Sequence, residues 1–325
     1  MKIAIITSAG LSGAGAISDY LLSREDFVSP FKKKVDYKQD YEFRILHDPF
    51  GIEHLYNSFY KNFSVNNAAY AFHQFCLYTK NLKNLKDVKT NKKIYSDNFF
   101  LELTKYTKKI IKLSYYGLPQ HFRIQMKKMD RIKWRIQNFN NQKFAQDTNF
   151  YNMVIPVSEK EFLIHTKSFL KKIINLHNRS QKKNIVIDQG ANFWNPESVN
   201  KYFDNSKVIQ VIRDPKGVFS SMKTRKSLSY PGNNIKLFVK WFKETNLIER
   251  KIQGKKTLKI KFEQFIINHN TVKKKINKYL KIKNIKTNFD YIKTKKNLFN
   301  YKKKLSKEEI NYINKNLKEY VYFDI

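Results

Sequence analysis

The sequence predicts an α/β fold, a three-layer arrangement around a parallel sheet with a large helical insertion. Three observations lead to this prediction. Short continuous apolar runs occur near both ends of the 325-residue chain, as expected of strands that are covered on both faces. Apolar residues at helical spacing adjoin these runs. Between about residues 50 and 180 the helical pattern continues almost alone, which indicates an insertion between two parts of one sheet.

The first part of the chain reads as strand, loop and helix. The apolar run Lys2–Thr7 predicts a strand, and the amphipathic stretch Ala16–Leu22 predicts a helix after a loop of small residues. The insertion carries further helical patterns and one strand pattern. These are His54–Phe63, Ala69–Leu82 and Glu159–Leu176 for helices, and Met153–Val157 for a strand.

Strand patterns return after the insertion. We expect strands at Asn184–Asp188, Lys207–Ile212 and Thr257–Phe262, with helices at Glu197–Phe203 and Lys216–Thr224. We therefore interpret residues 1–325 as a single domain, with the helical insertion 50–180 covering one end of the sheet, on the acceptor side. No Pro/Gly/Ser-rich linker marks a clean boundary.

The chain is strongly basic, with a formal net charge of +37. Only nine of its 64 basic residues are arginine, and the lysines are scattered from end to end. This distribution favours a lysine-rich solvated surface over a dedicated nucleic-acid face, so we expect no specific nucleic-acid partner. The long-range field still attracts anionic substrates such as phosphates, sulfates and acidic glycans.

Cysteine content and hydropathy limit the class further. Cys76 is the single cysteine, which excludes an internal disulfide and fits a reducing cytoplasm. No run approaches the ~20 apolar residues of a membrane span. The opening residues look like a secretory leader, but their continuous apolar run, Ile3–Ile6, is shorter than the ~7–15 residues such leaders need. We therefore expect a cytoplasmic protein.

The loop after the first strand has phosphate-binding character. In TSAGLSGAGAIS, Gly10 and Gly15 have the spacing of a P-loop, at a place where backbone N–H groups can hold an anion. A nucleoside-triphosphatase loop continues with Lys and then Ser or Thr, for the phosphates and for magnesium. Those places hold Ala16 and Ile17 here, which speaks against magnesium-dependent phosphoryl transfer.

The same loop allows two other interpretations. Gly13-x-Gly15-x-x-Ser18 is a degraded dinucleotide fingerprint. A tight strand-to-helix turn that binds nothing also uses small residues, so the loop alone indicates phosphate binding and no more.

A second segment, Lys207–Ser221, carries more information. A buried strand ends at Arg213-Asp214-Pro215, and a helix begins at once, because Pro suits a helix start and Asp214 can cap it. Arg213 then sits at the carboxyl edge of the sheet, where ligands of open α/β sheets bind. An arginine fork with the hydroxyl of Ser221 suits a phosphate monoester. A capped helix with a surface arginine is the alternative.

Together the two segments resemble the sulfotransferases that use 3′-phosphoadenosine 5′-phosphosulfate, of the bacterial carbohydrate type. The resemblance implies a P-loop-like fold in which Arg213 and Ser221 hold the 3′-phosphate. It also implies that the first loop holds the 5′-phosphosulfate, through Ser12, Gly13, Ala14, Gly15, Ala16 and Ile17. No metal is required, because the sulfo group passes directly to the acceptor.

The resemblance extends to the C-terminal part and covers residues 1–25 and 184–320. Tyr230–Phe242 looks like the helix after the 3′-phosphate segment, and Leu258–His269 like a conserved strand end of the family. Lys295–Ile310 looks like the loop that returns to the nucleotide, which implies contacts from Lys296 and Asn297.

Ile187–Trp194 resembles a segment of glycosaminoglycan sulfotransferases whose acidic residue is the catalytic base. The match implies that Asp188 removes the proton of the acceptor hydroxyl. A loop hydrogen bond is the structural alternative for this side chain. Two cations of the family are missing: Leu11 replaces a Lys or Arg of the first loop, and Gln189 replaces a lysine beside the base. A weakened or inactive enzyme is therefore an alternative.

The acceptor is less well marked. Tyr41–Gly51 places Arg44, His47 and Asp48 near a second strand, and we take His47 and Asp48 as candidate catalytic contacts to a hydroxyl-bearing acceptor, a carbohydrate or small molecule. A structural role beside the Asp-Pro turn is the alternative.

Two other functions stay open at this point. A P-loop kinase or nucleoside triphosphatase predicts magnesium dependence. A basic nucleic-acid-binding protein with a vestigial nucleotide fold predicts an affinity that falls steeply with salt.

Overall fold

The computed structural model describes most of the chain. The residues described are 1–29, 44–86, 95–115, 117, 127–136, 153–177, 184–225, 229–251, 257–285, 287–291, 295 and 298–322. By its internal contacts the chain divides into two compact units. Unit 1 comprises Met1–Asp40 and Asn178–Ile325, and unit 2 comprises Tyr41–His177. In sequence, unit 2 is therefore inserted between the two parts of unit 1.

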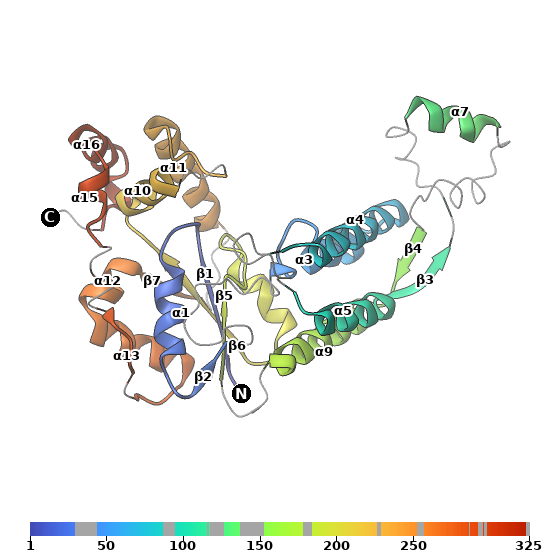
Figure 1. Cartoon of the computed structure of the whole chain (residues 1–325), viewed down its shortest axis with the longest axis horizontal. Coiled ribbons are helices and arrows are strands. Elements are labelled where there is room, and N and C mark those ends of the chain that lie inside the picture. The colour runs from blue at the N-terminus through green and yellow to red at the C-terminus, as the bar shows by residue number, and fades with distance from the viewer. Residues whose placement is uncertain are drawn as a thin grey trace. The chain divides into compact units, whose positions relative to one another are not determined.

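Unit 1 is built on a five-stranded parallel sheet with the strand order β2-β5-β1-β6-β7 (Figure 1). The strands are β1 (Ile3–Ser8), β2 (Phe27–Val28), β5 (Asn184–Asp188), β6 (Ser206–Ile212) and β7 (Leu258–Lys261). The α/β class and the parallel sheet are thus confirmed, and four of the strands lie where the apolar runs predict them. The two-residue strand β2 gives no apolar run for sequence reasoning to find.

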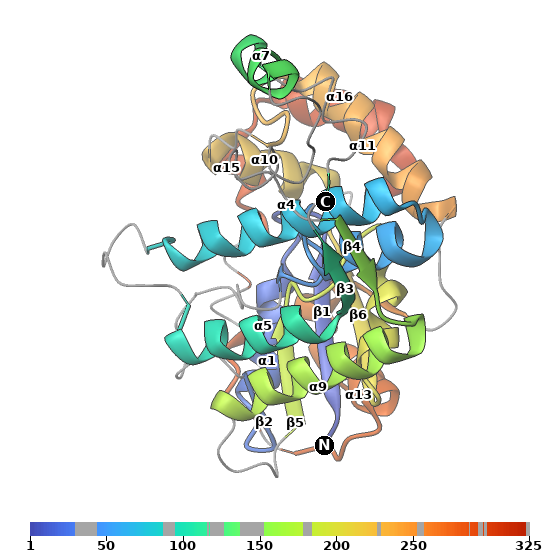
Figure 2. The same cartoon turned by 90° about the vertical axis from the view of Figure 1, so that its right-hand side faces the viewer.

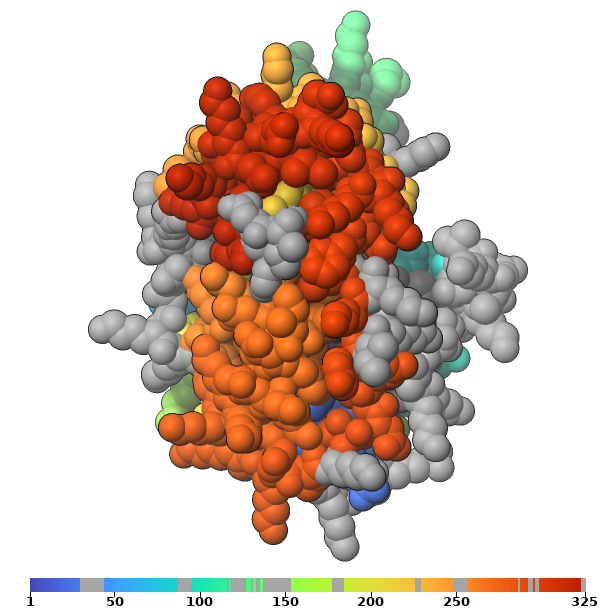
Figure 3. All heavy atoms as spheres, turned by 90° about the vertical axis from the view of Figure 1, so that its left-hand side faces the viewer, coloured from blue at the N-terminus to red at the C-terminus, as the bar shows by residue number. Residues whose placement is uncertain are grey.

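One face of this sheet is covered by helices α1 (Ala14–Leu22), α12 (Phe262–Ile267) and α13 (His269–Leu280). Side chains alternate along a strand, so Ala4 and Ile6 of β1 point into this layer and pack with Ile17 and Phe265. Figure 3 shows α12 and α13 in orange on the surface of the unit.

The opposite face meets the segment that follows β5. The Thr7 hydroxyl donates to the carbonyl of Ala191 at 2.7 Å, and the Gln210 amide donates to the carbonyl of Phe193 at 2.9 Å. The 3₁₀-helix η2 (Pro196–Tyr202) continues this layer, at the place where the sequence predicts a helix. Both polar side chains are fully buried, so these hydrogen bonds satisfy groups that water cannot reach.

A second apolar cluster lies beyond β6. It is formed by α10 (Pro215–Arg225), α11 (Ile235–Lys251), α15 (Tyr301–Lys304), α16 (Lys307–Asn316) and the 3₁₀-helix η3 (Lys318–Tyr320). Phe219, Phe238 and Phe242 are its centre, with Phe219 and Phe238 only 4.8 Å apart between ring centroids. The start of α10 is therefore held between the sheet and this cluster.

The described residues of unit 2 form helices and one hairpin (Figure 2). Its helices are α3 (Ile52–Tyr56), the π-helical turn η1 (Asn57–Lys61), α4 (Val65–Lys83), α5 (Asp97–Lys109), α7 (Lys128–Ile136) and α9 (Glu159–His177). The hairpin pairs β3 (Ile111–Tyr115) with β4 (Met153–Pro156) in antiparallel fashion. The strand predicted at Met153–Val157 is confirmed. Its partner β3 was not predicted, because its side chains are mostly exposed and give no buried pattern.

The expectation of a second strand near Tyr41–Gly51 is wrong for the part described. Residues 44–51 contain no strand; they form turns closed by hydrogen bonds from Gly51 to the carbonyl of Asp48 and from Ile52 to that of Ile45. The second strand of the chain is β2 in unit 1. In the described part of the chain, no helix has the length and apolar character needed to cross a membrane.

Candidate active site

The site lies at the carboxyl edge of the sheet in unit 1, where the ends of β1, β5 and β6 meet. In register, Ile6 pairs with Asp188, and Ser8 pairs with Val211. Parallel strands present their carboxyl ends on the same edge, so the loop after β1, Asp188 and Arg213 all emerge there. The sequence predicts each of these groups separately, and the sheet brings them to one edge.

The loop after β1 turns sharply into α1. Leu11 and Gly13 have φ of 68° and 88°, in the left-handed region. At Gly13 a Cβ would come within 2.4 Å of the Phe262 ring, so only glycine fits both the backbone and the space. At Gly15 a Cβ would meet nothing within 4 Å, and the residue is exposed. The N-terminal end of α1 is therefore open on this side.

The other predicted loop residues take different places. Ser12, Ala14 and Ile17 are buried, Ala14 and Ile17 in the core under the sheet. The backbone N–H of Ala16 donates to the carbonyl of Gly13 at 3.1 Å. The side chains of Ala14 and Ile17 therefore face the core, and at this loop a ligand would meet backbone groups rather than these two side chains.

Arg213 joins the two predicted segments. Its Nη1 donates to the carbonyl of Leu11 and to the Oγ of Ser221, each at 3.1 Å. Its guanidinium carbon lies 5.0 Å from the centre of the Phe262 ring, a cation–π distance. At Gly217 a Cβ would come within 2.6 Å of Arg213 Nε, so the absence of a side chain lets the arginine lie across the first turns of α10. Burial lowers the pKa of Arg213.

Asp214 is a structural residue of the site. As predicted, it caps α10: its Oδ1 accepts from the N–H of Lys216 at 2.9 Å. Its own N–H donates to Oε1 of Glu263 at 3.0 Å, and its Oδ2 accepts from the N–H of Tyr322 at 3.0 Å. These bonds fix the end of β6 to the start of α12 and to the C-terminal segment.

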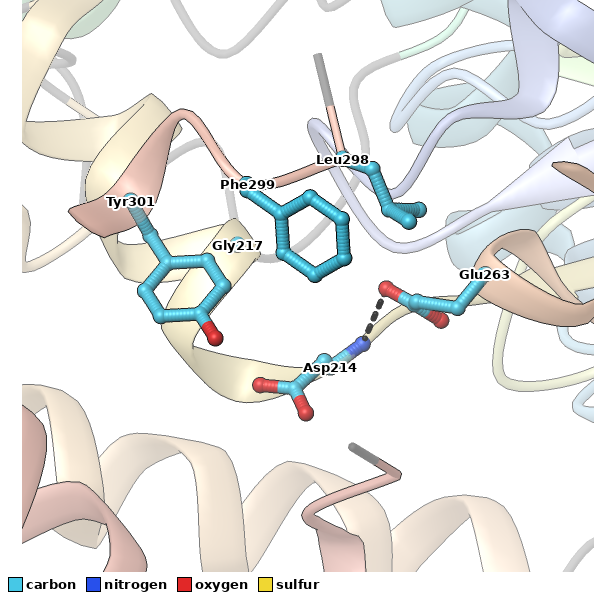
Figure 4. A pocket seen from close by; sticks show the side chains of 6 residues that line it. All are labelled: Asp214, Gly217, Glu263, Leu298, Phe299 and Tyr301. Atoms are coloured by element: carbon cyan, nitrogen blue, oxygen red, sulfur yellow. Dashed lines mark hydrogen bonds between the residues drawn. The ribbon is translucent and has the colours of Figure 1, made fainter. Parts of the chain in front are cut away.

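Glu263 is a functional candidate that sequence reasoning named only as part of a matched strand end. It is 4% exposed, and burial raises its pKa. Together with Asp214 it lines a small pocket, closed on the other side by Leu298, Phe299 and Tyr301 (Figure 4). The returning segment thus reaches the Arg213-Asp214 turn, while Lys296 and Asn297 lie outside the described residues.

The side chain of Leu11 packs against the apolar cluster of α10, α11 and α16. An apolar side chain suits this position, because an ammonium group pointing the same way would be desolvated. The loop is instead tied down by its carbonyl, which accepts from Arg213.

Asp188 ends β5 and is 7% exposed. The next residue, Gln189, has a left-handed φ of 56°, and its Nε2 donates to Ser8 Oγ at 3.0 Å. This bond joins the ends of β5 and β1. The Gln189 amide therefore braces the carboxyl edge of the sheet.

His47 and Asp48 belong to unit 2. Asp48 accepts from the Tyr78 hydroxyl at 2.5 Å and forms an ion pair with Arg44 at 3.3 Å. Burial, together with this hydrogen bond, raises the pKa of Tyr78. Asp48 thus has structural partners within its own unit, and its role toward an acceptor stays a prediction, as does that of His47.

No protein-family model matches the chain, and no curated protein matches it. Solved structures do. The sulfotransferase domain from the curacin biosynthetic pathway matches with a TM-score of 0.39 and 12% identity, over 98% of this chain and 97% of that one. A sulfotransferase domain from the Synechococcus olefin synthase gives 0.36 and 12%, over 87% and 74%. A sulfotransferase from Mycobacterium avium gives 0.39 and 10%, over 100% and 77%.

At this identity the likeness concerns the fold alone. The chain has an α/β fold with a five-stranded parallel sheet, and these three solved structures that resemble it are sulfotransferase domains.

Proposed function

We propose that this protein is a sulfotransferase that moves a sulfo group from 3′-phosphoadenosine 5′-phosphosulfate to an acceptor hydroxyl. The observation that carries the proposal is the position of Arg213. Its guanidinium contacts both the loop after β1 and Ser221 of α10, at the carboxyl edge of the sheet. One half-buried arginine thus links the two places where a nucleotide with two separated phosphate groups would be held.

The donor set fits such a nucleotide. For the 3′-phosphate we propose Arg213 and Ser221, because a guanidinium and a hydroxyl supply directed N–H and O–H donors to phosphate oxygens. For the 5′-phosphosulfate we propose the amino end of α1 with the Ser12 hydroxyl, since helix N-termini attract anions. Gly15 is open at this end of the helix, where a side chain would narrow the approach.

The nucleotide supplies the activated sulfo group. We assign the proton transfer to Asp188: its carboxylate takes the proton of the acceptor hydroxyl as that oxygen bonds to sulfur. The bond between sulfur and the bridging phosphate oxygen breaks, and its electron pair leaves with the bisphosphate. Negative charge then develops on the 5′-phosphate of the leaving bisphosphate. We assign its stabilisation to backbone N–H groups of the first loop, which are fixed before the reaction starts.

For the acceptor we propose a hydroxyl of a carbohydrate or small molecule, with His47 and Asp48 as candidate contacts. The net charge of +37 favours acceptors that carry negative groups. We further propose that the reaction takes place in the cytoplasm. In the native fold Cys76 would be unreactive there, because burial raises the pKa of its thiol to about 11.

Thermal unfolding with 3′-phosphoadenosine 5′-phosphate tests the nucleotide half. At ~100 times its dissociation constant this product should stabilise the protein by roughly 2.7 kcal/mol. Arg213→Ala should lose this effect. Arg225→Ala is the matched control, because it removes the same charge from an exposed position in the last turn of α10, the helix that carries Ser221. If only ATP with magnesium, or a DNA oligomer, stabilises the protein, the proposal is wrong.

Asp188→Asn tests the chemical half. The amide keeps the shape of the carboxylate but cannot take a proton, so bisphosphate binding should persist while sulfo transfer falls by about 10²–10⁴-fold. The measurement is transfer of radiolabelled sulfo groups to a panel of sugars, at saturating donor. Wild-type activity in this variant would exclude Asp188 as the base and leave the nucleotide site standing.

A further inference from the structure

We infer that helix α7 (Lys128–Ile136) docks on the surface of an anionic lipid bilayer. The inference does not depend on the proposed function. Its first observation is exposure: Met129, Ile132 and Ile136 are 64%, 40% and 72% exposed. Every residue of the helix whose side chain is described is exposed. An apolar set of this size on a helix normally faces a core.

The three apolar residues form one stripe. At 100° per residue, positions 129, 132 and 136 lie within about 60° of one another around the helix axis. By the same geometry, Lys128, Arg135 and Arg131 follow on one flank of the stripe, about 40°, 60° and 100° beyond Ile132 around the axis. The helix is therefore amphipathic with an apolar stripe and a cationic face, the pattern of helices that lie in the plane of a membrane interface.

The preceding strand carries the same character. Leu113 and Tyr115, two positions apart and therefore on one face of β3, are 54% and 44% exposed. Exposed large apolar side chains thus occur on both elements between residues 111 and 136. Scattered single residues of this kind are normal, but a helix and a strand that both present them indicate a contact surface.

Helix stability points the same way. α7 has nine residues. Isolated helices shorter than ~12–15 residues are marginal in water, because the first turn fixes several dihedral angles for a single hydrogen bond. A surface that buries the apolar stripe would supply the missing stabilisation. We therefore expect α7 to gain helix content when it binds.

The charge of this segment favours an anionic bilayer over other partners. Residues 127–136 contain five basic residues and one acidic residue. A second copy of the chain is disfavoured, because each copy carries a net charge of +37. Nucleic acid would satisfy the cations but leave the apolar stripe in water. An anionic bilayer satisfies both, with phosphate headgroups for the lysine and arginine side chains and acyl chains for the stripe.

Vesicle co-sedimentation of the full-length chain tests the inference. The protein should bind vesicles of phosphatidylcholine with phosphatidylglycerol, and bind pure phosphatidylcholine at least about tenfold more weakly. The decisive variant replaces the stripe with serine: Met129→Ser, Ile132→Ser and Ile136→Ser. It keeps every charge, and its affinity for the mixed vesicles should fall at least about tenfold, because three buried apolar side chains are lost.

The matched control is a second triple-serine variant at equally exposed apolar positions on other helices: Leu101→Ser, Ile164→Ser and Leu237→Ser, which are 54%, 53% and 53% exposed. It should bind like the wild type. Because all six positions are exposed, both variants should keep the wild-type unfolding transition, which confirms that a loss of binding is local.

Three results would overturn the inference. In the first, the stripe variant binds mixed vesicles as well as the wild type does, so that scattered lysines account for the binding. In the second, the wild type binds neither kind of vesicle. In the third, the wild type forms a concentration-dependent dimer or a nucleic-acid complex that the stripe variant cannot form, while both proteins bind vesicles equally. That result would assign the surface to a second copy or to nucleic acid.

Discussion

Two glycines of the same loop should respond to alanine in opposite directions. Gly13 has a left-handed φ of 88°, and its added Cβ would come within 2.4 Å of the Phe262 ring. A left-handed alanine costs about 1–2 kcal/mol, and forcing a methyl group into packed surroundings costs a further ~1–3 kcal/mol. Gly13→Ala should therefore lower the free energy of unfolding of unit 1 by roughly 2–5 kcal/mol.

Gly15→Ala is the internal control. Gly15 lies in the first turn of α1, and its Cβ would meet nothing within 4 Å. Alanine in a helix is favoured over glycine by about 0.5–1 kcal/mol, so this variant should be unchanged or slightly more stable. The comparison needs no absolute stability, because both variants are measured against the same wild type.

Urea unfolding followed by far-ultraviolet circular dichroism provides the assay. The midpoint should shift to lower urea for Gly13→Ala and should not do so for Gly15→Ala. Phe262 also lies against Arg213, so the displaced ring should weaken bisphosphate binding in Gly13→Ala at temperatures where the variant is folded. Equal midpoints for the two variants would refute the argument, since neither the left-handed turn nor the Phe262 contact would then constrain the loop.

Three further outcomes follow from described contacts. The raised pKa of Glu263 means that its contribution to stability is full below the unfolded pKa of ~4.3 and is lost as pH rises toward the folded pKa. Relative to the wild type, Glu263→Gln should therefore gain stability in urea unfolding as the pH rises above the unfolded pKa of ~4.3, and a difference that stays flat with pH would contradict the burial of the carboxyl. Cys76, whose pKa burial raises to about 11, should react with iodoacetamide at neutral pH far more slowly in the native chain than in urea; equal rates would refute this. Ser306 and Glu309 form a capping box at the start of α16, so Ser306→Ala should destabilise by about 1 kcal/mol, and Ser306→Asp, which keeps a cap, should not.

The α/β class and most of unit 1 could be predicted because they follow from local patterns. Strands buried on both faces leave continuous apolar runs, which is why β5 matches its predicted span Asn184–Asp188 and β6 differs by one residue. The capping role of Asp214 is equally local, because its carboxylate accepts from the N–H of Lys216, only two positions later in the sequence.

Unit 2 was harder to predict for a physical reason. Strand β3 leaves most of its side chains exposed, so no buried period marks it, and it pairs with β4 across an interval of 37 residues in sequence, from Tyr115 to Met153. The turns at residues 44–51 close through backbone hydrogen bonds, which residue types specify only weakly.

The sequence alone determined which groups could bind an anion: a glycine loop, an arginine and a serine at known spacings. Only the tertiary structure decided how they combine. The sheet order sets β6 next to β1, and Arg213 can then reach the carbonyl of Leu11, which is 202 positions away in sequence. The burial of Glu263 and the packing of Leu11 against the apolar cluster were also decided by the tertiary structure, because both depend on helices contributed by distant parts of the chain.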